Sequence, residues 1–361
     1  MKAAMFHGPH QPLTIENVDI DKPAGREVLV RVVASGVCHS DLHFVDGLYP
    51  FPTPAILGHE AAWIVEAVGL QVSELSPGDH VIACLSVFCG HCDYCLTGKT
   101  HLCQTRPVRG KNEPPKLSWK GQPVNQFANL SSYAEKMLVH ENALVKIDDT
   151  MPLDRAALIG CGVTTGLGAA LNTAQVRAGS TCAVIGCGGV GLAAIQGCRI
   201  AGASRIIAVD TQAWKLDLAK SLGATDGVNA KESDAVMQVQ GLIPGGVDYA
   251  FECLGSKQTA TQTFAMVKKG GTAIMVGVVP MGQMVEIPGL DLVLSGKKLL
   301  GSMMGDNRFR TDMPRYVEFY LSGQLKLDEM ISARLKLDQV NHAFDEMRRG
   351  AAARSVVVFD A

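Results

Sequence analysis

The stretch from Thr181 to Asp210 constrains the fold of this chain more than any other part of the sequence. It begins with a short apolar run, 181–185, which is typical of a buried strand, and the turn sequence GCGGVG follows at once over 186–191. An apolar helical run comes next, and a second apolar strand, 205–209, ends at the aspartate. Strand, glycine-rich turn, helix and strand in this order predict a parallel βαβ unit that binds a dinucleotide.

Each glycine of this turn has its own physical role. Gly186 permits a tight turn, Gly188 lets the backbone approach a pyrophosphate, and Gly191 lets the helix pack closely on the strand. The start of the helix at Gly189 and Val190 offers free N–H groups and the positive end of the helix dipole to the phosphates. The turn is therefore a candidate phosphate site.

Asp210 indicates which dinucleotide is bound. It lies about twenty residues past the glycines, where a carboxylate accepts hydrogen bonds from the adenosine ribose hydroxyls. A carboxylate there repels a 2′-phosphate, and Thr211 beside it supplies no cation, so NAD is favoured over NADP. Lys215 is close enough in sequence to reach the ribose edge, although a solvated helix lysine explains it equally well.

Size and composition limit the class of protein. With 361 residues, of which 47% are hydrophobic, the chain is long enough for two domains with a sizeable core. A net charge of −2 gives no case for nucleic acid or an acidic membrane surface. The N-terminal residues show no signal peptide, and no uninterrupted apolar run approaches the length of about 18 residues needed to span a bilayer. We therefore expect a cytoplasmic protein, in which eleven cysteines point to metal binding rather than disulfides.

The pattern of apolar residues changes along the chain. Short strand-like runs with glycine and proline between them predict an antiparallel, partly open barrel up to about residue 85. Residues 104–131 are polar and without a clear period, which predicts a long loop. From about Val163 strands alternate with helices, which predicts a parallel sheet with helices on both faces. After about Met303 the chain leaves that sheet, and the run 355–359 is predicted to return to the first domain as a strand.

Four cysteines form the strongest local signal. Cys89, Cys92, Cys95 and Cys103 follow the spacing C-x2-C-x2-C-x7-C, in a segment that glycines allow to bend. This spacing favours a closed tetrahedral zinc site over a set of buried free thiols. Because four thiolates leave no open position, the role of this zinc is to fold the segment.

A second set of metal-binding residue types is scattered through the chain. Cys38, His59 and Cys161 are each, taken singly, more often core residues than ligands. Together they could make a Cys₂His zinc site whose fourth position is open to water or an alcohol, although spacing alone favours core residues. An ion held in this way lowers the pKa of a bound hydroxyl.

Several independent motifs occur in the order found in one family, and the whole chain resembles the zinc-dependent medium-chain alcohol dehydrogenases. The matching segments are 38–41, 58–60, the four-cysteine segment, 160–166, 186–191 and Asp210. The resemblance implies an α/β fold of two domains. One is a GroES-like, partly open β-barrel catalytic domain over 1–162 and 304–361, and the other is a Rossmann domain, a doubly wound parallel sheet, over 163–303.

The resemblance also implies roles for single residues. Cys38, His59 and Cys161 hold the catalytic zinc, Asp41 orients the histidine, and Glu60 lies behind the metal; whether Glu60 ever ligates the zinc stays open. The proton relay and the cofactor contacts follow the family in the same way. Ser40 accepts the alcohol proton and His43 carries it to solvent. His39 and Arg354 contact the pyrophosphate, and the residues that line the cofactor cleft are Thr165, Val190, Val276 and Val278. The residues that surround the substrate are Tyr49, Leu85 and Val278. An ordinary surface histidine is the alternative interpretation of His43.

The expected reaction is reversible oxidation of a primary alcohol with an apolar or aromatic body, by hydride transfer to NAD, with two zinc ions per chain. One branch of the family oxidises the glutathione adduct of formaldehyde, but Tyr49 replaces an acidic residue of that branch, and His43 is unusual for it. A zinc-free quinone or enoyl reductase and a non-enzymatic dinucleotide-binding protein are the competing classes. The loop 104–131 resembles that of dimeric members, so a homodimer is favoured over the tetramer of some bacterial relatives.

Overall fold

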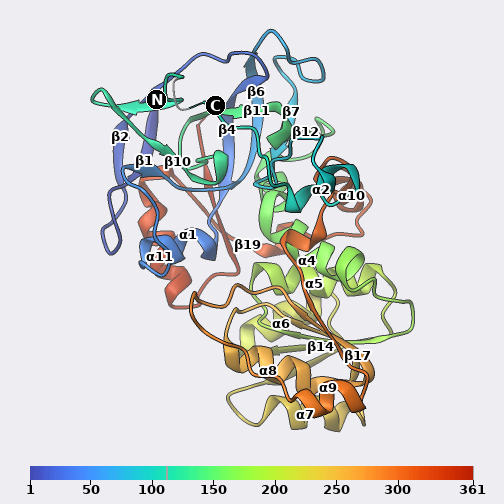
Figure 1. The fold of residues 1–361 in the computed structure, drawn as a ribbon. Coiled ribbons are helices and arrows are strands. Elements are labelled where there is room, and N and C mark those ends of the chain that lie inside the picture. Colours follow the sequence, from blue (N-terminus) through green and yellow to red (C-terminus); the bar gives the residue numbers. More distant parts are fainter. Residues whose placement is uncertain (111–112, 361) are drawn as a thin grey trace. The chain divides into compact units, whose positions relative to one another are not determined.

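A computed structural model describes residues 1–110 and 113–360 of the chain (Figure 1). The chain forms two compact units, one comprising Met1–Cys161 and Arg308–Ala361 and the other Gly162–Asn307. The second boundary lies a few residues beyond the predicted position near Met303. The reason is a close approach within the second unit, where a side chain on Gly168 would lie 2.4 Å from the carbonyl oxygen of Gly305.

The first unit is built around a mostly antiparallel sheet in which β4 (Glu27–Gly36) pairs with β6 (Glu60–Val68). Buried residues alternate with partly exposed ones along much of β4, as expected for a strand with one face on a core. The strand β20 (Arg354–Val358) pairs antiparallel with β4, which confirms the predicted return of the C-terminal strand. The other strands of this sheet are β7 (His80–Ala83), β11 (Lys136–His140), β12 (Leu144–Lys146) and β19 (Ile331–Leu335).

Smaller sheets and helices complete this unit. The order β10-β5-β1-β2 forms a second sheet and β3-β8-β9 a third. Their strands are β1 (Lys2–Phe6), β2 (Thr14–Asn17), β3 (Asp19–Ile20), β5 (Ala55–Ile56), β8 (Leu117–Trp119), β9 (Gln122–Pro123) and β10 (Asn125–Gln126). The helices are α1 (His39–Val45), α2 (Asp93–Leu96), α3 (Leu153–Leu158), α10 (Phe309–Leu321) and α11 (Val340–Arg348).

The segment 104–131 is not the structureless loop that the sequence predicted. It contains β8, β9 and β10, and β8 pairs with β3 while β10 pairs with β5. These strands are two or three residues long, so they show no periodicity of their own. Pairing with distant strands forms them, and a local pattern could not reveal it.

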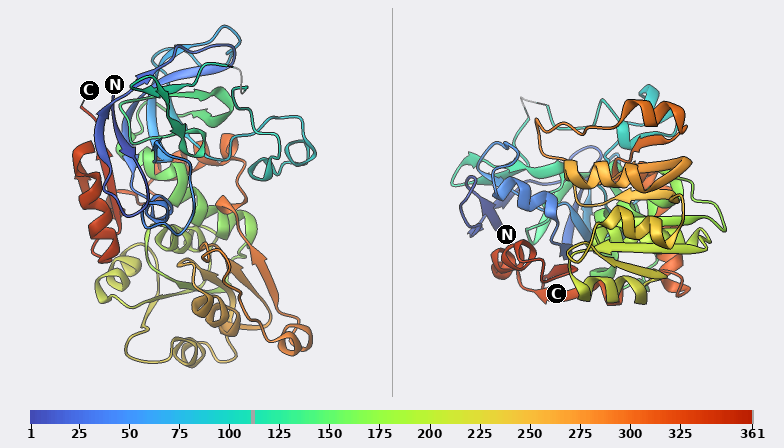
Figure 2. Two further views of the ribbon diagram at one scale, coloured as in Figure 1. Left: turned by 60° about the vertical axis from the view of Figure 1, so that its left-hand side comes forward. Right: turned by 90° about the horizontal axis from the view of Figure 1, so that it is seen from below.

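The second unit contains a sheet that is parallel throughout, in the order β15-β14-β13-β16-β17-β18. Helices lie on both of its faces (Figure 2). The central strands are buried along nearly their whole length, as parallel strands between two helix layers must be. The strands are β13 (Thr181–Ile185), β14 (Arg205–Asp210), β15 (Asp226–Asn229), β16 (Val247–Glu252), β17 (Val267–Met275) and β18 (Lys298–Gly301).

The helices of this unit agree in position with the predicted alternation. The helices are α4 (Thr164–Gly168), α5 (Gly189–Ile200), α6 (Ala213–Ser221), α7 (Ala235–Leu242), α8 (Lys257–Met266) and α9 (Gly289–Leu294). The chain passes from β13 outwards through β14 to β15 and then returns to β16 beside β13, so the strand order reverses between β13 and β16.

One helical stretch among the described residues, Leu153–Thr173, is long and apolar enough to cross a membrane by length and composition. Within its most apolar window, 83% of the residues are buried inside the structure, which is also the property of a core helix.

Candidate metal and dinucleotide sites

The structure brings together the three scattered residues of the predicted open metal site. Cys38 caps the start of α1, His59 directly precedes β6, and Cys161 lies in a π-helical turn, Ile159–Val163, that follows α3. Their ligand atoms all lie within 4.8 Å of one another, and all three side chains are buried. A π turn adds a residue to the helical repeat and so redirects a side chain, which explains how a helix can aim this cysteine inwards.

The donor set and its spacing fit a zinc ion. Tetrahedral zinc, with Zn–S of about 2.3 Å and Zn–N of about 2.0 Å, holds a sulfur and a nitrogen about 3.5 Å apart. The distance between His59 Nε2 and Cys161 Sγ is 3.2 Å, close to that value. Glu60 lies outside the group of atoms that approach one another within 4.8 Å. The chain thus offers three ligands, and a tetrahedral ion would keep one position for a small molecule.

The two thiols of this site share their protons unequally. The hydrogen bond from Cys161 lowers the pKa of Cys38 well below its usual value, against burial and with help from the charge of His59. The same hydrogen bond and burial raise the pKa of Cys161 well above its usual value. A first thiolate therefore forms readily, and a divalent cation would supply the charge that stabilises the second.

A buried hydrogen-bond chain fixes the orientation of His59. Asp41 Oδ1 lies 3.1 Å from His59 Nδ1 and accepts a 3.0 Å hydrogen bond from the Gly58 N–H. Tyr133 donates its hydroxyl to Asp41 Oδ2 at 2.8 Å. Burial opposes a charge on His59, but Asp41 raises its pKa well above the usual value. The carboxylate thus directs Nδ1 to itself and leaves Nε2 for the metal.

Tyr133 is a site residue that sequence reasoning missed. Its partner Asp41 is 92 residues away, and a tyrosine in an otherwise ordinary strand-rich stretch gives no local signal. The structure also shows a contact that was not predicted between two assigned residues. Arg354 forms a buried ion pair with Glu60 through its guanidinium. Burial raises the pKa of Glu60 to about 7, against the charge of Arg354. The predicted contact of Arg354 with a pyrophosphate stays a prediction.

Helix α1 presents the residues of the predicted proton relay. Ser40 and His43 are half-buried, and His39 is exposed. The rings of His43 and Tyr49 are 5.7 Å apart, and those of His39 and His43 are 5.8 Å apart. Burial lowers the pKa of His43, against the negative groups Cys38 and Asp46. A neutral imidazole with a partly open surface is suited to accept a proton and release it to water.

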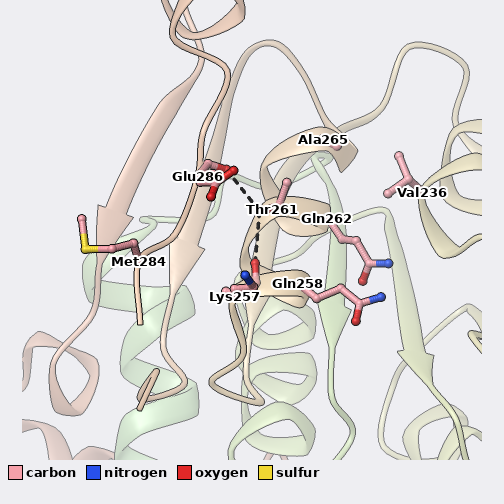
Figure 3. A pocket seen from close by; sticks show the side chains of 8 residues that line it. All are labelled: Val236, Lys257, Gln258, Thr261, Gln262, Ala265, Met284 and Glu286. Atoms are coloured by element: carbon pink, nitrogen blue, oxygen red, sulfur yellow. Dashed lines mark hydrogen bonds between the residues drawn. The ribbon is translucent and has the colours of Figure 1, made fainter. Parts of the chain in front are cut away.

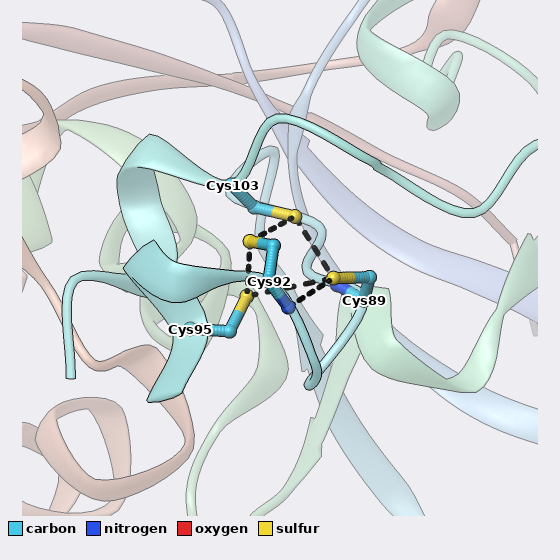
Figure 4. Close-up of side chains that lie close together, drawn as sticks. All are labelled: Cys89, Cys92, Cys95 and Cys103. Atoms are coloured by element: carbon cyan, nitrogen blue, oxygen red, sulfur yellow. Dashed lines mark hydrogen bonds between the residues drawn. The ribbon is translucent and has the colours of Figure 1, made fainter. Parts of the chain in front are cut away.

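The four-cysteine segment forms a compact sulfur cluster (Figure 4). Sγ–Sγ distances of 3.5 Å (Cys92 to Cys95), 3.8 Å (Cys89 to Cys95) and 3.9 Å (Cys92 to Cys103) match the edge of about 3.8 Å in a tetrahedral ZnS₄ group. Partial burial opposes ionisation of Cys89, but hydrogen bonds from Thr105 and nearby N–H groups lower its pKa to about 5. The segment is thus arranged for a closed zinc site.

The glycine-rich turn of the second unit has the predicted geometry. Gly186 has a φ of +92°, and a side chain on Gly191 would lie 1.7 Å from the Gly186 carbonyl oxygen, so neither position accepts one. A side chain on Gly188 would meet nothing within 4 Å, and this open space is where a phosphate could approach the backbone. Asp210 accepts hydrogen bonds from the N–H groups of Cys187 (2.8 Å) and Gln212 (2.9 Å).

The remaining predicted cofactor residues divide between the units. Thr165 and Val276 are buried in the second unit, Gly189 and Val190 begin α5, and Val278 is 57% exposed. Lys215 Nζ lies 5.6 Å from the ring centre of the neighbouring Trp214. The first unit contributes the others. It holds His39, Arg354 and the predicted pocket residues Tyr49 and Leu85.

A pocket of about 390 Å³ opens on the second unit beside α8 (Figure 3). None of the predicted site residues lines it. Thr261 in its wall donates hydrogen bonds to the carbonyl oxygens of Lys257 and Glu286, both at 3.1 Å. Its lining mixes polar and apolar side chains without a group that points to one ligand. The residues are Val236, Lys257, Gln258, Thr261, Gln262, Ala265, Met284 and Glu286.

Comparison with known proteins shows the family to which the chain belongs. Residues 24–149 match the family model of the alcohol dehydrogenase GroES-like domain, and residues 189–322 match that of the zinc-binding dehydrogenases. Alcohol dehydrogenase class-3 of Drosophila melanogaster is 42% identical over 99% of this chain and 97% of its own length.

Two solved structures are similar over nearly their full length. An alcohol dehydrogenase zinc-binding domain protein from Burkholderia ambifaria has a TM-score of 0.95 at 37% identity, and the match covers 100% of this chain and 99% of that chain. Benzyl alcohol dehydrogenase from Acinetobacter calcoaceticus has a TM-score of 0.94 at 34% identity, covering 99% of both chains.

Proposed function

The chain belongs to the zinc-dependent medium-chain alcohol dehydrogenase family, and on this basis we propose that it oxidises a primary alcohol with an apolar or aromatic body reversibly to the aldehyde, with NAD as hydride acceptor. As a member of this family it is an oxidoreductase. The observation that carries the proposal is the buried cluster of Cys38, His59 and Cys161, which provides three ligands of the kind that leave zinc an open position.

We propose that each of the two clusters holds one zinc ion. At the cluster with three ligands, zinc would supply Lewis acidity that lowers the pKa of an alcohol hydroxyl. The chain's own groups do the rest. Asp41 keeps His59 in the tautomer that leaves Nε2 free, Ser40 accepts the alcohol proton, and His43 transfers it to solvent. A bound nicotinamide would supply the acceptor for the hydride of the substrate carbon.

The preference for NAD rests on Asp210. Its carboxylate is held in place by the N–H groups of Cys187 and Gln212, so it cannot swing away from an incoming ribose. A fixed negative charge at the ribose edge repels a 2′-phosphate. The nearby cation, Lys215, lies over the Trp214 ring.

The proposed substrate class rests on the aromatic side chains that pack around Tyr49. Its ring contacts those of His43 and Phe44 at centroid distances of 5.7 and 5.8 Å, and Phe44 in turn packs on Phe127 at 4.8 Å. Phe127 also contacts His59. A rigid aromatic wall next to a metal ligand favours flat apolar substrates, and the similar benzyl alcohol dehydrogenase supports this choice.

A second candidate is S-(hydroxymethyl)glutathione, because relatives named alcohol dehydrogenase class-3 reach 42% identity. That substrate carries carboxylates and needs cationic or polar partners in the pocket. The aromatic Tyr49, where that branch of the family has an acid, argues against it.

A screen of substrates and cofactors tests the proposal. Aliphatic, allylic and benzylic alcohols are offered with NAD and with NADP, and formaldehyde is offered with and without glutathione. We expect the highest kcat/KM for benzylic or allylic alcohols with NAD. Oxidation of formaldehyde only in the presence of glutathione would replace the proposal with the second candidate. Reduction of quinones with NADPH by a metal-free protein would indicate the zinc-free reductase class.

Replacing Ser40 by alanine is expected to lower kcat about a hundredfold, because general acid–base groups contribute on this scale. Zinc content and NADH affinity should stay unchanged, since Ser40 belongs to neither ligand cluster. Steady-state kinetics and metal analysis measure both quantities. Ser322→Ala, at the end of α10, is the matched control with normal turnover. Full activity of Ser40→Ala would remove Ser40 from the proton path.

We also propose a homodimer joined through the second unit. The strand β18 is the edge strand of the sheet, and all its residues are exposed. The adjacent α9 exposes Leu290 (74%), Val293 (75%) and Leu294 (74%). An unpaired apolar edge of this kind is a site for strand pairing with a second copy. Sedimentation of the wild-type protein and of Leu294→Glu, which should shift towards the monomer, tests the assembly.

A further inference from the structure

The order of the parallel strands determines which turns face the nicotinamide half of a dinucleotide. Such cofactors bind outside the carboxyl ends of the strands, across the point where the strand order reverses. Here the reversal lies between β13 and β16. The glycine-rich turn after β13 and Asp210 at the end of β14 serve the pyrophosphate and the adenosine ribose. The nicotinamide half is therefore directed to the other side, towards the turns that follow β16 and β17.

A buried carboxylate, that of Glu252, lies at this point. It is the last residue of β16 and is 0% exposed. Its Oε1 accepts hydrogen bonds from the N–H groups of Leu254 (3.0 Å) and Gly255 (2.9 Å) and from the Thr259 hydroxyl (2.7 Å). Oε2 accepts a further bond from the Gly255 N–H at 3.0 Å. Every hydrogen bond that the described residues make to this carboxylate thus comes from a donor in the turn after β16 or in α8.

The same residue also reaches the turn after β17. Its carbonyl oxygen accepts hydrogen bonds from the N–H groups of Val276 and Gly277, both at 2.9 Å. A side chain on Gly277 would lie 2.6 Å from Glu252 Oε2, so this turn passes directly over the carboxylate.

The two turns are in turn packed against each other and against the glycine-rich turn. A side chain on Gly255 would lie 2.4 Å from the Val278 carbonyl oxygen, and one on Gly186 would lie 2.7 Å from Leu254 Cγ. Leu254 and Val278 are 59% and 57% exposed, although both are apolar. They are two exposed apolar side chains whose positions depend on the Glu252 carboxylate.

We infer that Glu252 is a positioning residue for the nicotinamide half of the cofactor: it holds Leu254 and Val278 in place by joining the turns after β16 and β17. The inference rests on the proposed use of a nicotinamide dinucleotide. It assigns Glu252 no contact with the cofactor, and it leaves the adenosine half to the glycine-rich turn and Asp210.

Replacement of Glu252 by glutamine tests this role because it keeps the shape of the side chain. The amide oxygen can take the place of Oε1, but the NH₂ group then faces the Gly255 N–H, and two donors meet where a donor met an acceptor. A buried array that loses an acceptor in this way does not keep its geometry. The turn should shift, and the side chains of Leu254 and Val278 should shift with it.

The experiment uses the full-length, zinc-loaded protein and two probes, NADH and ADP-ribose, which lacks the nicotinamide. We expect Glu252→Gln to raise the Kd of NADH about tenfold, the cost of one buried charged hydrogen bond, and to leave the Kd of ADP-ribose within about twofold. Fluorescence titration and calorimetry give the two constants. Thr259→Val, which removes only the hydroxyl donor, should shift the Kd of NADH in the same direction by a smaller factor.

Asp248→Asn is the matched control. Asp248 lies at the opposite end of β16, where it accepts hydrogen bonds from Thr181, and its replacement should change neither constant. The inference would be overturned if Glu252→Gln weakened the binding of NADH and ADP-ribose equally, or if it left the binding of NADH unchanged. Wild-type protein that binds neither probe would instead overturn the proposed function. If Glu252→Gln does not fold, Thr259→Val is compared with Asp248→Asn instead. The test is again whether the Kd of NADH rises while the Kd of ADP-ribose stays the same.

Discussion

Replacing Cys161 by serine should lower kcat for alcohol oxidation about a thousandfold or more while the protein stays folded. The change removes one sulfur ligand, and a hydroxyl is a poor substitute at a site built from soft donors. A Lewis-acidic metal contributes several kcal/mol to a reaction that develops charge on oxygen, and about 4 kcal/mol corresponds to a thousandfold in rate. The side chain is nearly isosteric, so packing around the π-helical turn should be kept.

Metal analysis and kinetics on the same sample check this expectation. Zinc at the four-cysteine segment should remain, so the loss is confined to the other site. Cys84→Ser is the matched control, because Cys84 is equally buried in the same unit but belongs to neither cluster. Undiminished turnover in Cys161→Ser would show that the reaction does not depend on the cluster of Cys38, His59 and Cys161.

A substitution in the four-cysteine segment should affect the stability of the protein, whereas Cys161→Ser should affect its turnover. Replacing Cys92 by serine is expected to unfold the segment and to lower the melting temperature by roughly 10 °C, because structural zinc sites supply folding free energy directly. Helix α2 in this segment contains no buried residue, and Leu96 is 71% exposed. Because this helix buries no residue of its own, a metal bound by the four cysteines would contribute much of the stability of this stretch of chain.

The loss should also reach α10. Phe88, just before the first cysteine, packs on Phe309 with ring centres 5.7 Å apart, and Arg310 lies 5.3 Å from the Phe88 ring centre. Limited proteolysis should therefore cut Cys92→Ser near 89–103 first, with the N-terminal end of α10 exposed next. A variant that keeps the wild-type melting temperature and protease pattern would contradict a structural role for this zinc.

Local patterns were sufficient for the two motifs that are short in sequence. The four cysteines fall within one short segment, and the glycine-rich turn joins one strand directly to one helix. Chain connectivity limits such segments to few conformations, so spacing alone predicts their geometry. Short apolar runs likewise predicted strands of both units, because burial of a strand requires apolar residues on its buried faces.

Contacts between distant residues needed more than local patterns. Spacing did not join Cys38, His59 and Cys161; ligand chemistry suggested them as a set, and the family resemblance assigned them to the catalytic zinc. Tyr133 on Asp41, Arg354 on Glu60, and the short strands between residues 104 and 131 were not expected at all. Nothing local in the sequence showed that the carboxylate of Glu252 joins two turns.

The sequence by itself determined the class of fold, the four-cysteine segment and the glycine-rich turn, because each is encoded in residues that are neighbours along the chain. The tertiary structure alone decided which distant side chains meet: a π turn, a strand register and a buried carboxylate bring them within hydrogen-bonding distance. The physical reason is that local conformation depends on a few adjacent residues, whereas a long-range contact depends on how all the intervening elements pack.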